Sequence, residues 1–185
     1  MTNQKKENVF ITGATGCVGH YLIRECLKNP NLHIHILVRN PAKLKFSEAE
    51  FKHITIHMGD FKQIEKHAPI VSKMDYIIHS ITEWWGAEQT IQVNVDKTKE
   101  FFMMADQNRL KQIVYFSTAS IIGKNNQVIE EAKLYGSDYI KSKYYAYHMI
   151  KSLPFANKIT TVFPTMVFGG DNTYPQSHIT TGVYS

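Results

Sequence analysis

The sequence predicts an α/β protein built on a doubly wound parallel sheet, in three α/β/α layers. Short apolar runs typical of strands alternate with longer segments of helical periodicity, and this alternation favours a parallel sheet. Two of the runs, 76–78 and 113–116, are almost entirely apolar, as expected for strands that are covered on both faces. A chain of 185 residues is long enough for one domain with a sizeable core and too short for two ordinary domains.

The expected elements follow one another along the chain. Strands are predicted at about 8–12, 33–38, 53–58, 75–79, 112–117 and 159–163. Helices are predicted at about 17–28, 87–107 and 136–152, with a shorter helix near 61–67. The helix at 87–107 is expected to be amphipathic, because its apolar residues recur at helical spacing.

Residues 9–19 combine an apolar run, three glycines and the start of a helical segment. In a strand–turn–helix unit an early glycine permits the tight turn, a second lets the backbone approach phosphates, and a third lets the helix pack on the strand. The free N–H groups and the positive dipole end of the helix then face the anion. This context predicts a dinucleotide pyrophosphate site in a Rossmann fold. Its expected contacts are Gly13, Thr15, Gly16, Cys17, Val18 and Gly19.

Further candidates for the cofactor site come directly after the next strands, where parallel sheets bind their ligands. Arg39 stands where NAD-binding proteins usually carry an acid for the ribose 2′-hydroxyl, and an arginine there suits a 2′-phosphate. The sequence therefore favours NADP and leaves NAD possible. Asp60, with Phe61 beside it, follows the third strand, where its carboxylate either bonds the adenine or caps a helix. Ser80, Ile81 and Thr82 follow the fourth strand, where their backbone is expected to run along the cofactor.

A proton-transfer pair is predicted at the start of the helix near 136–152. Tyr139 and Lys143 are four residues apart and share a helix face. A neighbouring ammonium favours the phenolate and lowers the pKa of a tyrosine, so the pair suits acid/base work near neutral pH. Thr118, after the fifth strand, is expected to hold the substrate oxygen. Tyr147 and Lys151 have the same spacing but lie about 12 Å further down the helix axis, and we expect Tyr147 to serve packing or subunit contact.

These motifs together resemble the extended short-chain dehydrogenase/reductase family, which includes NAD(P)-dependent epimerases, dehydratases and reductases. The matching stretches are 12–19, 59–60, 94–98, 117–123, 139–143 and 163–169, in the order of the family. The resemblance implies that Tyr139 is the catalytic acid/base, Lys143 its partner and a ribose ligand, and Thr118 the usual Ser/Thr. It also implies that Asp60 contacts the adenine. The remaining cofactor contacts that it implies are Asn94, Pro164 and Val167.

Three positions depart from the pattern of the family. Lys97 stands where a glycine is usual, Phe163 where an arginine is common, and Ile122 where a tyrosine is common. The last two departures put a sugar-nucleotide substrate in doubt, and Arg39 favours the reductase relatives that use NADP. Trp84 and Trp85 follow the fourth strand, where they either line a substrate pocket or pack within the loop.

Members of this family are longer than 185 residues, and their C-terminal part covers the substrate. We therefore expect residues 1–170 to form the dinucleotide-binding domain and 171–185 to begin a truncated or missing substrate region. Such a chain should bind cofactor but turn over poorly, since no lid excludes water. The resemblance also implies a homodimer through the helices at 87–107 and 136–152.

Composition narrows the remaining possibilities. The formal net charge is +5, but the basic residues are scattered, which does not indicate a nucleic-acid partner. No apolar run approaches the ~20 residues needed to cross a bilayer, and the first eight residues have no signal-peptide core. His33 and His35 share a strand face without a third metal ligand, and Cys17 and Cys26 are expected to be reduced thiols. We expect a cytoplasmic protein without a metal, membrane or nucleic-acid site.

Two functions remain open from the sequence. In the first, hydride moves between a nicotinamide and a hydroxyl-bearing carbon of a sugar nucleotide or small alcohol or ketone, while Tyr139 moves the proton. In the second, the chain is a regulatory module that binds NADP without chemistry. The set of Tyr139, Lys143 and Thr118 favours the first, because a sensor does not need it.

Overall fold

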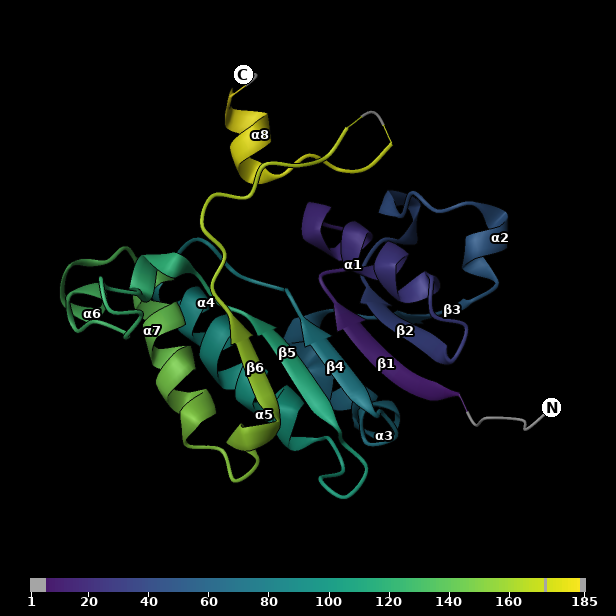
Figure 1. Ribbon diagram of the computed structural model, residues 1–185, viewed down its shortest axis with the longest axis horizontal. Helices are drawn as coiled ribbons and strands as arrows, with labels where there is room; N and C mark the ends of the chain where they lie inside the picture. The colour runs from purple at the N-terminus through teal and green to yellow at the C-terminus, as the bar shows by residue number, and fades with distance from the viewer. Residues whose placement is uncertain (1–5, 172, 184–185) are drawn as a thin grey trace.

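The protein is a parallel sheet flanked by helices, as the computed structural model in Figure 1 shows. The structure describes residues 6–171 and 173–183. Six parallel strands lie in the order β3-β2-β1-β4-β5-β6. The strands are β1 Glu7–Thr12, β2 Leu32–Val38, β3 Ile54–Met58, β4 Tyr76–His79, β5 Gln112–Phe116 and β6 Ile159–Val162. Each end lies within one residue of its predicted position, and the predicted fold class is confirmed.

The predicted helices are present at their expected places, but several differ from the prediction in length. The helices are α1 Cys17–Leu27, α2 Glu48–Phe51, α3 Ala68–Val71, α4 Ala87–Ile91, α5 Thr98–Met103, α6 Glu131–Tyr135, α7 Asp138–Lys151 and α8 His178–Val183. The predicted helices at 17–28 and 136–152 correspond to α1 and α7. The short helix predicted near 61–67 is a 3₁₀ helix, Phe61–His67. The sequence analysis missed α2, α3, α6 and α8, each six residues or fewer, which are too short to show a periodic pattern.

The helix predicted at about 87–107 is present over 87–103, but it is not α-helical throughout. A π-helical turn, Gln92–Lys97, separates α4 from α5. In this turn the Thr98 hydroxyl donates to the Val93 carbonyl at 3.1 Å. The helix also ends earlier than predicted, at Met103. Beyond it the Asp106 carboxylate accepts from the Asn108 N–H at 2.9 Å, and this local bond competes with helix continuation.

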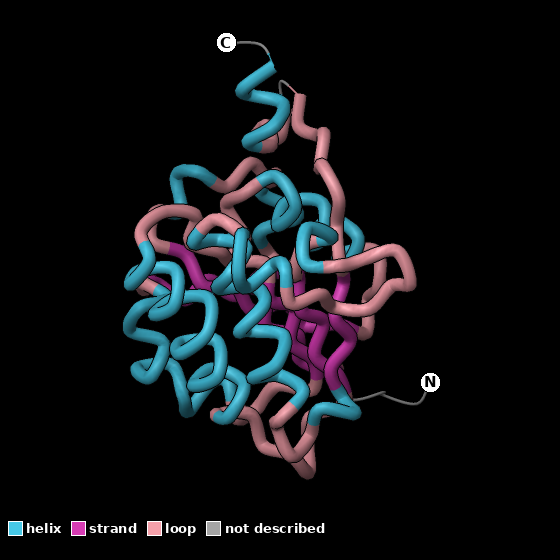
Figure 2. The backbone as a smooth tube through the Cα atoms, turned by 90° about the vertical axis from the view of Figure 1, so that its left-hand side faces the viewer, coloured by secondary structure: helices cyan, strands magenta, loops and turns pink. Residues whose placement is uncertain are grey.

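The sheet separates two apolar cores. The larger core lies on the face covered by α5 and α7, where Ile77, Ile113 and Tyr115 pack with Phe101 and Phe102. The second core lies under α1 and contains alternate residues of β1 and β2. Figure 2 shows most of the helices gathered on one side of the strands. The two faces are therefore covered unequally.

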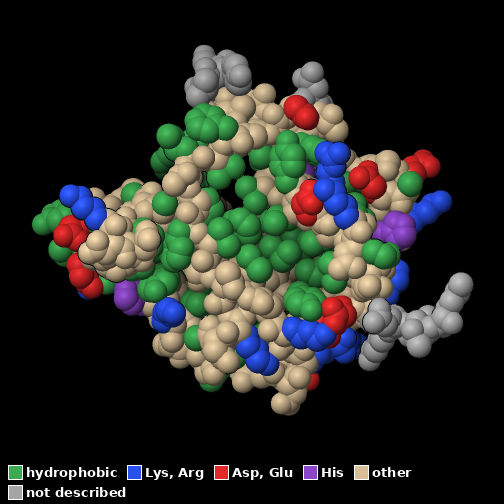
Figure 3. Space-filling view, viewed as in Figure 1, with side chains coloured by type: hydrophobic (Ala, Val, Ile, Leu, Met, Phe, Trp, Pro, Cys, Tyr) green, Lys and Arg blue, Asp and Glu red, His purple; other side chains and the backbone are tan. Residues whose placement is uncertain are grey.

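The α1 face of β4–β6 carries apolar side chains that remain half-buried. In Figure 1, α1 and α2 lie over β1–β3 only. Tyr76, Ile78, Val114 and Phe116 alternate with the buried residues of their strands and point to this uncovered area. Figure 3 shows hydrophobic side chains gathered over the middle of the same face. The runs 76–78 and 113–116 were expected to form strands covered on both faces. Among the described residues, helices cover only one face of these strands.

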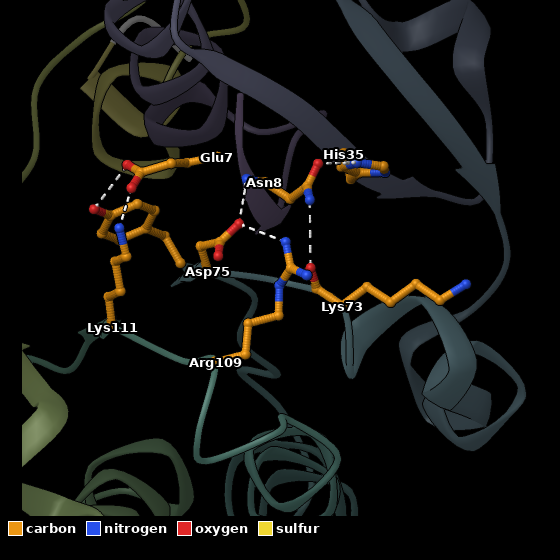
Figure 4. Close-up of polar contacts among 8 residues, drawn as sticks. Glu7, Asn8, His35, Lys73, Asp75, Arg109 and Lys111 are labelled. Carbon is orange, nitrogen blue, oxygen red and sulfur yellow. Dashed lines mark hydrogen bonds and ion pairs between the residues drawn. The ribbon is translucent and has the colours of Figure 1, made fainter. Parts of the chain in front are cut away.

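Ion pairs and hydrogen bonds fix the amino-terminal edge of the sheet, as Figure 4 shows. The Asp75 carboxylate accepts from the Asn8 N–H at 2.7 Å and from the Arg109 guanidinium at 3.0 Å. Glu7 pairs with Lys111 beside it. These contacts join the starts of β1, β4 and β5. The opposite, carboxyl edge is the one at which ligands of such sheets bind.

The chain after β6 turns back over α1. Tyr174 is buried, and its ring packs against the rings of His20, Tyr21 and Phe46 at 5.3–6.5 Å between centroids. Part of the predicted substrate region, residues 171–185, therefore lies against the dinucleotide-binding part; residues 172, 184 and 185 lie outside the described residues. The domain boundary at 170 stays a prediction. Within the described residues no helix has the length and apolarity to cross a membrane.

Candidate active site

The glycine turn has the geometry that its spacing predicts. Gly13 has φ +78°, and a Cβ there would lie 2.5 Å from the Ser80 Oγ. The Gly16 N–H donates to the Gly13 carbonyl at 3.0 Å and Gly16 caps α1. A Cβ on Gly19 would lie 2.1 Å from the Gly13 carbonyl oxygen. The turn therefore depends on Gly13 for its conformation and on Gly19 for the close approach of α1.

Gly19→Ala is expected to destabilise the protein by about 1–3 kcal/mol or more, because the added methyl overlaps backbone that cannot yield without moving the turn. Gly16→Ala is the matched control, since its Cβ would meet its nearest neighbour at an ordinary 3.5 Å. We expect it to cost less than about 1 kcal/mol. Urea unfolding of the two variants checks this expectation, and equal stability losses would contradict it.

A cleft of about 120 Å³ opens beside this turn. The structure brings seven of the predicted cofactor residues to its lining: Gly13, Thr15, Arg39, Asp60, Phe61, Ile81 and Thr82. The lining also includes Lys62 and Glu83, which the sequence analysis did not select. The Arg39 guanidinium lies 3.8 Å from the Asp60 carboxylate, and both side chains are exposed. Ser80 does not line the cleft; its hydroxyl donates to the Thr12 carbonyl at 2.9 Å and fixes the backbone there.

Other predicted cofactor residues lie elsewhere. Cys17, Val18 and Val167 line a second cavity of about 450 Å³, between α1 and the segment after β6. Burial raises the pKa of the Cys17 thiol. The Pro164 carbonyl accepts from the Ala119 N–H at 2.8 Å, which joins the segments after β5 and β6. The structure therefore does not bring these side chains into the cleft, and their contact with a cofactor stays a prediction.

Asn94 is buried and holds the loop after β4. Its Oδ1 accepts from the Glu83 N–H at 2.8 Å, and its Nδ2 donates to the Glu83 carbonyl at 2.8 Å and to the Ser142 Oγ at 2.9 Å. The Ser142 hydroxyl in turn donates to the Tyr139 carbonyl at 2.7 Å. The amide thus connects the loop to α7, which gives Asn94 a positioning role, and its direct contact with a cofactor stays a prediction.

The structure brings the predicted catalytic residues together at the carboxyl edge of the sheet. Ser137 caps α7, which places Tyr139 in its first turn. The Lys143 Nζ donates to the Phe116 carbonyl at 3.0 Å and lies 5.9 Å from the centroid of the Tyr139 ring. Thr118, at the end of β5, lies close enough to Tyr139 to affect its pKa.

The electrostatics of this pair differ from the expectation. Burial lowers the pKa of Lys143, which is 2% exposed, to about 7. Burial raises the pKa of Tyr139, and an interaction with Thr118 opposes the rise in part. The expectation that Lys143 lowers the pKa of Tyr139 is not met here, because both groups lose hydration and Lys143 loses much of its charge near neutral pH.

A buried aromatic layer under Lys143 was not predicted as part of the site. The Tyr115 hydroxyl lies 3.4 Å from the Lys143 Nζ, and the Tyr115 ring stacks on His79 at 5.8 Å. The His79 ring nitrogens are within 2.7 Å of Thr12 and 3.0 Å of Thr98, and burial lowers the pKa of His79 far below its usual range. An imidazole that stays neutral adds no competing charge beside Lys143. The apolar sequence around Tyr115 gave no sign of this role.

These residues fit a dinucleotide. No side chain caps the N-terminus of α1 at Gly16, so the first N–H groups of this helix are free to bind a phosphate. Ser117 adds an unsatisfied group: its Oγ is buried at the end of β5 without a hydrogen-bond partner among the described residues. Within the described ranges no cluster of three His, Cys, Asp or Glu side chains is placed to hold a metal ion.

The sequence matches the model of the NAD dependent epimerase/dehydratase family over residues 9–184. The chain belongs to this family. That membership confirms the resemblance derived from the motifs.

Two curated proteins that are similar to this chain are enzymes of different kinds. The sterol-4-alpha-carboxylate 3-dehydrogenase (decarboxylating) of Candida albicans is 29% identical over 135 residues, which cover 69% of this chain and 39% of the relative. A hybrid PKS-NRPS synthetase of an Acremonium species is 35% identical over 137 residues, which cover 68% of this chain and 3% of the relative. The chain thus spans well under half the length of either relative.

Solved structures of other proteins share the fold. The terminal R domain from the myxalamid PKS-NRPS pathway superposes with a TM-score of 0.77 at 21% identity, over 94% of this chain and 53% of that one. The UDP-glucuronic acid 4-epimerase of Bacillus cereus, in complex with NAD, gives 0.71 at 17% identity, over 90% of this chain and 58% of that one. At these identities, the similarity shows a shared fold and nothing about substrate or cofactor.

Proposed function

We propose that this chain is the dinucleotide-binding and catalytic part of an NAD(P)-dependent oxidoreductase of the epimerase/dehydratase type. The observation that carries the proposal is the convergence of Tyr139, Lys143 and Thr118 at the carboxyl edge of the sheet. The substrate is a small molecule with a hydroxyl-bearing or carbonyl carbon. A bound nicotinamide supplies the hydride donor or acceptor for that carbon.

The residues of the chain account for the proton. Tyr139 is the acid/base that exchanges a proton with the substrate oxygen, and Thr118 orients that oxygen by a hydrogen bond. Because burial raises the pKa of Tyr139, its phenol carries a proton at neutral pH and suits proton donation to a carbonyl. Lys143, whose Nζ lies 5.9 Å from the centroid of the phenol ring, would replenish this proton and would be the residue that binds the ribose of the cofactor.

A non-catalytic NADP-binding module remains the second candidate. A sensor would need the glycine turn and the cleft, but it has no need of a buried lysine whose pKa lies near 7. The two functions separate in one assay, which follows NADPH oxidation with a panel of ketones and NADP⁺ reduction with a panel of alcohols and sugar nucleotides. Turnover that depends on Tyr139 supports the enzyme, and dinucleotide binding without any turnover supports the sensor.

We propose NADP as the preferred cofactor, with NAD as a weaker ligand. Arg39 and Lys62 are two cations in the lining of the cleft, and Arg39 lies 3.8 Å from the Asp60 carboxylate. A 2′-phosphate would take the Arg39 guanidinium from its long contact with Asp60 and form charge-assisted hydrogen bonds. The relatives solved with NAD give no evidence on this preference at their level of identity.

Arg39→Ala is expected to weaken NADP binding by about tenfold or more and to leave NAD binding nearly unchanged, since a hydrogen bond to a charged group contributes about 1.5–3 kcal/mol. Titration of intrinsic or NADPH fluorescence measures both affinities. The control is Lys43→Ala, a nearby exposed cation outside the cleft lining, which should change neither. A parallel loss of NAD and NADP affinity in Arg39→Ala would count against a 2′-phosphate contact.

The finer predictions on assembly and location remain proposals. A homodimer through α4–α5 and α7 is supported by Met103 and Tyr145, which are apolar or aromatic, lie on these helices and are 47% and 40% exposed. A cytoplasmic location is supported by the composition and by the two free cysteines, Cys17 and Cys26.

A further inference from the structure

The side chain of Trp84 covers the ring of the proposed acid/base. The indole and the Tyr139 phenol are stacked, with centroids 4.2 Å apart and an angle of 26° between planes. His178 meets the same indole edge-on at 5.5 Å. No other aromatic contact in the described residues has so short a centroid distance, and it falls on Tyr139.

The loop that carries Trp84 is fixed. Asn94 binds the backbone of Glu83, the preceding residue, through both its N–H and its carbonyl. The Glu83 carboxylate accepts from the Trp84 N–H at 3.1 Å. Gly86, at φ +83°, turns the chain into α4 two residues later. The local backbone therefore holds the indole beside the phenol. Trp84 is not a core residue, since 38% of it remains exposed.

Lys143 is buried and lies 5.9 Å from the centroid of the Tyr139 ring, whereas the loops after β4, β5 and β6 contain no cation. Residues 80–86, 117–122 and 163–170 include no Lys or Arg, and Glu83 is their single charged residue. A nucleotide sugar carries a diphosphate, which proteins bind with arginine, lysine or exposed backbone N–H groups. The indole offers a flat apolar surface and a single N–H donor in place of these groups.

We propose that Trp84 determines substrate specificity, as an apolar wall that selects an uncharged substrate whose reacting hydroxyl or ketone lies on an apolar ring. This inference rests on the proposed function, because it takes Tyr139 as the point of reaction. The ring of the substrate packs against the indole while its oxygen reaches the phenol and Thr118. A sugar nucleotide is disfavoured because these three loops offer its phosphates no Lys or Arg side chain.

The chain has two tryptophans, so Trp85→Phe leaves Trp84 as the single tryptophan reporter. Trp85 is 83% exposed and suits this substitution. In that background, with NADPH present, the bicyclic ketone 1-decalone is expected to change Trp84 emission, and UDP-glucose is expected to leave it unchanged. Trp84→Ala in the full chain should raise KM for 1-decalone by about tenfold with little effect on kcat, because a buried aromatic contact is lost while the proton transfer is kept.

Trp84→Phe keeps an aromatic wall and should recover most of the KM, which separates a role in binding from a loss of folding. The inference would be overturned if UDP-glucose changed the Trp84 emission and 1-decalone did not, or if neither ligand changed it. The proposed function is judged separately, by NADPH binding and by the Tyr139-dependence of any turnover. An active, Tyr139-dependent enzyme whose KM is indifferent to Trp84 would refute the wall and leave the proposed function standing.

Discussion

Tyr139→Phe is expected to lower turnover by about 10²–10⁴-fold, the usual contribution of a positioned acid/base, and to leave NADPH affinity nearly unchanged. The substitution removes the hydroxyl that exchanges a proton with the substrate. It keeps the ring that stacks on Trp84 at 4.2 Å, so the site retains its shape. Steady-state NADPH oxidation with the best substrate of a ketone panel, together with NADPH titration, measures the two effects.

Tyr147→Phe is the matched control for this experiment. Tyr147 and Lys151 repeat the spacing of the proposed pair and its geometry, with the ammonium 5.9 Å from the ring centroid in both cases. Tyr147, however, packs against Phe163 in a satellite cluster two turns further along α7. We expect turnover close to that of the unmodified chain. If the two variants behaved alike, the assignment of Tyr139 would be wrong.

The elements that the sequence predicts well are those whose pattern is local. Each strand is a short apolar run bounded by polar residues. This is why the ends of all six strands were predicted to within one residue. The glycine turn is equally local: the need for φ +78° at Gly13 and for contact at Gly19 can be inferred from spacing alone. Tyr139 could be preferred over Tyr147 because Ser137 marks the start of the helix.

The features that the sequence did not predict depend on residues far apart in the chain. The π-helical turn exists where Asn94 must reach both the loop after β4 and Ser142 on α7, a constraint absent from the local pattern. The split of the predicted cofactor residues between two cavities follows from the path of the chain after β6, which crosses to α1. Burial of Lys143, and with it the reversed pKa expectation, follows from packing against Tyr115.

Lys143→Met is expected to stabilise the protein at pH 7 by about 3 kcal/mol while it abolishes efficient turnover. A lysine pKa of about 7 in the folded state, against 10.5 for the free side chain, corresponds to a cost of about 5 kcal/mol. Loss of the hydrogen bonds to the Phe116 carbonyl and the Tyr115 hydroxyl offsets part of the gain, at about 1 kcal/mol each. Methionine fills the buried space without a charge.

The low pKa of Lys143 also predicts how the stability of the protein changes with pH. Between about pH 7 and pH 10.5 the unfolded chain binds a proton at Lys143 that the folded chain has released, so the unmodified protein should gain stability as the pH rises through this window. Lys143→Met should remove that slope, whereas Lys151→Met, at an exposed position on the same helix, should keep it. Urea unfolding at several pH values in the window measures the slopes. The prediction fails if Lys143→Met is less stable than the unmodified chain at pH 7, or if it keeps the pH slope. Either result would show that Lys143 stays charged in the folded protein, with its hydrogen bonds offsetting the cost of burial.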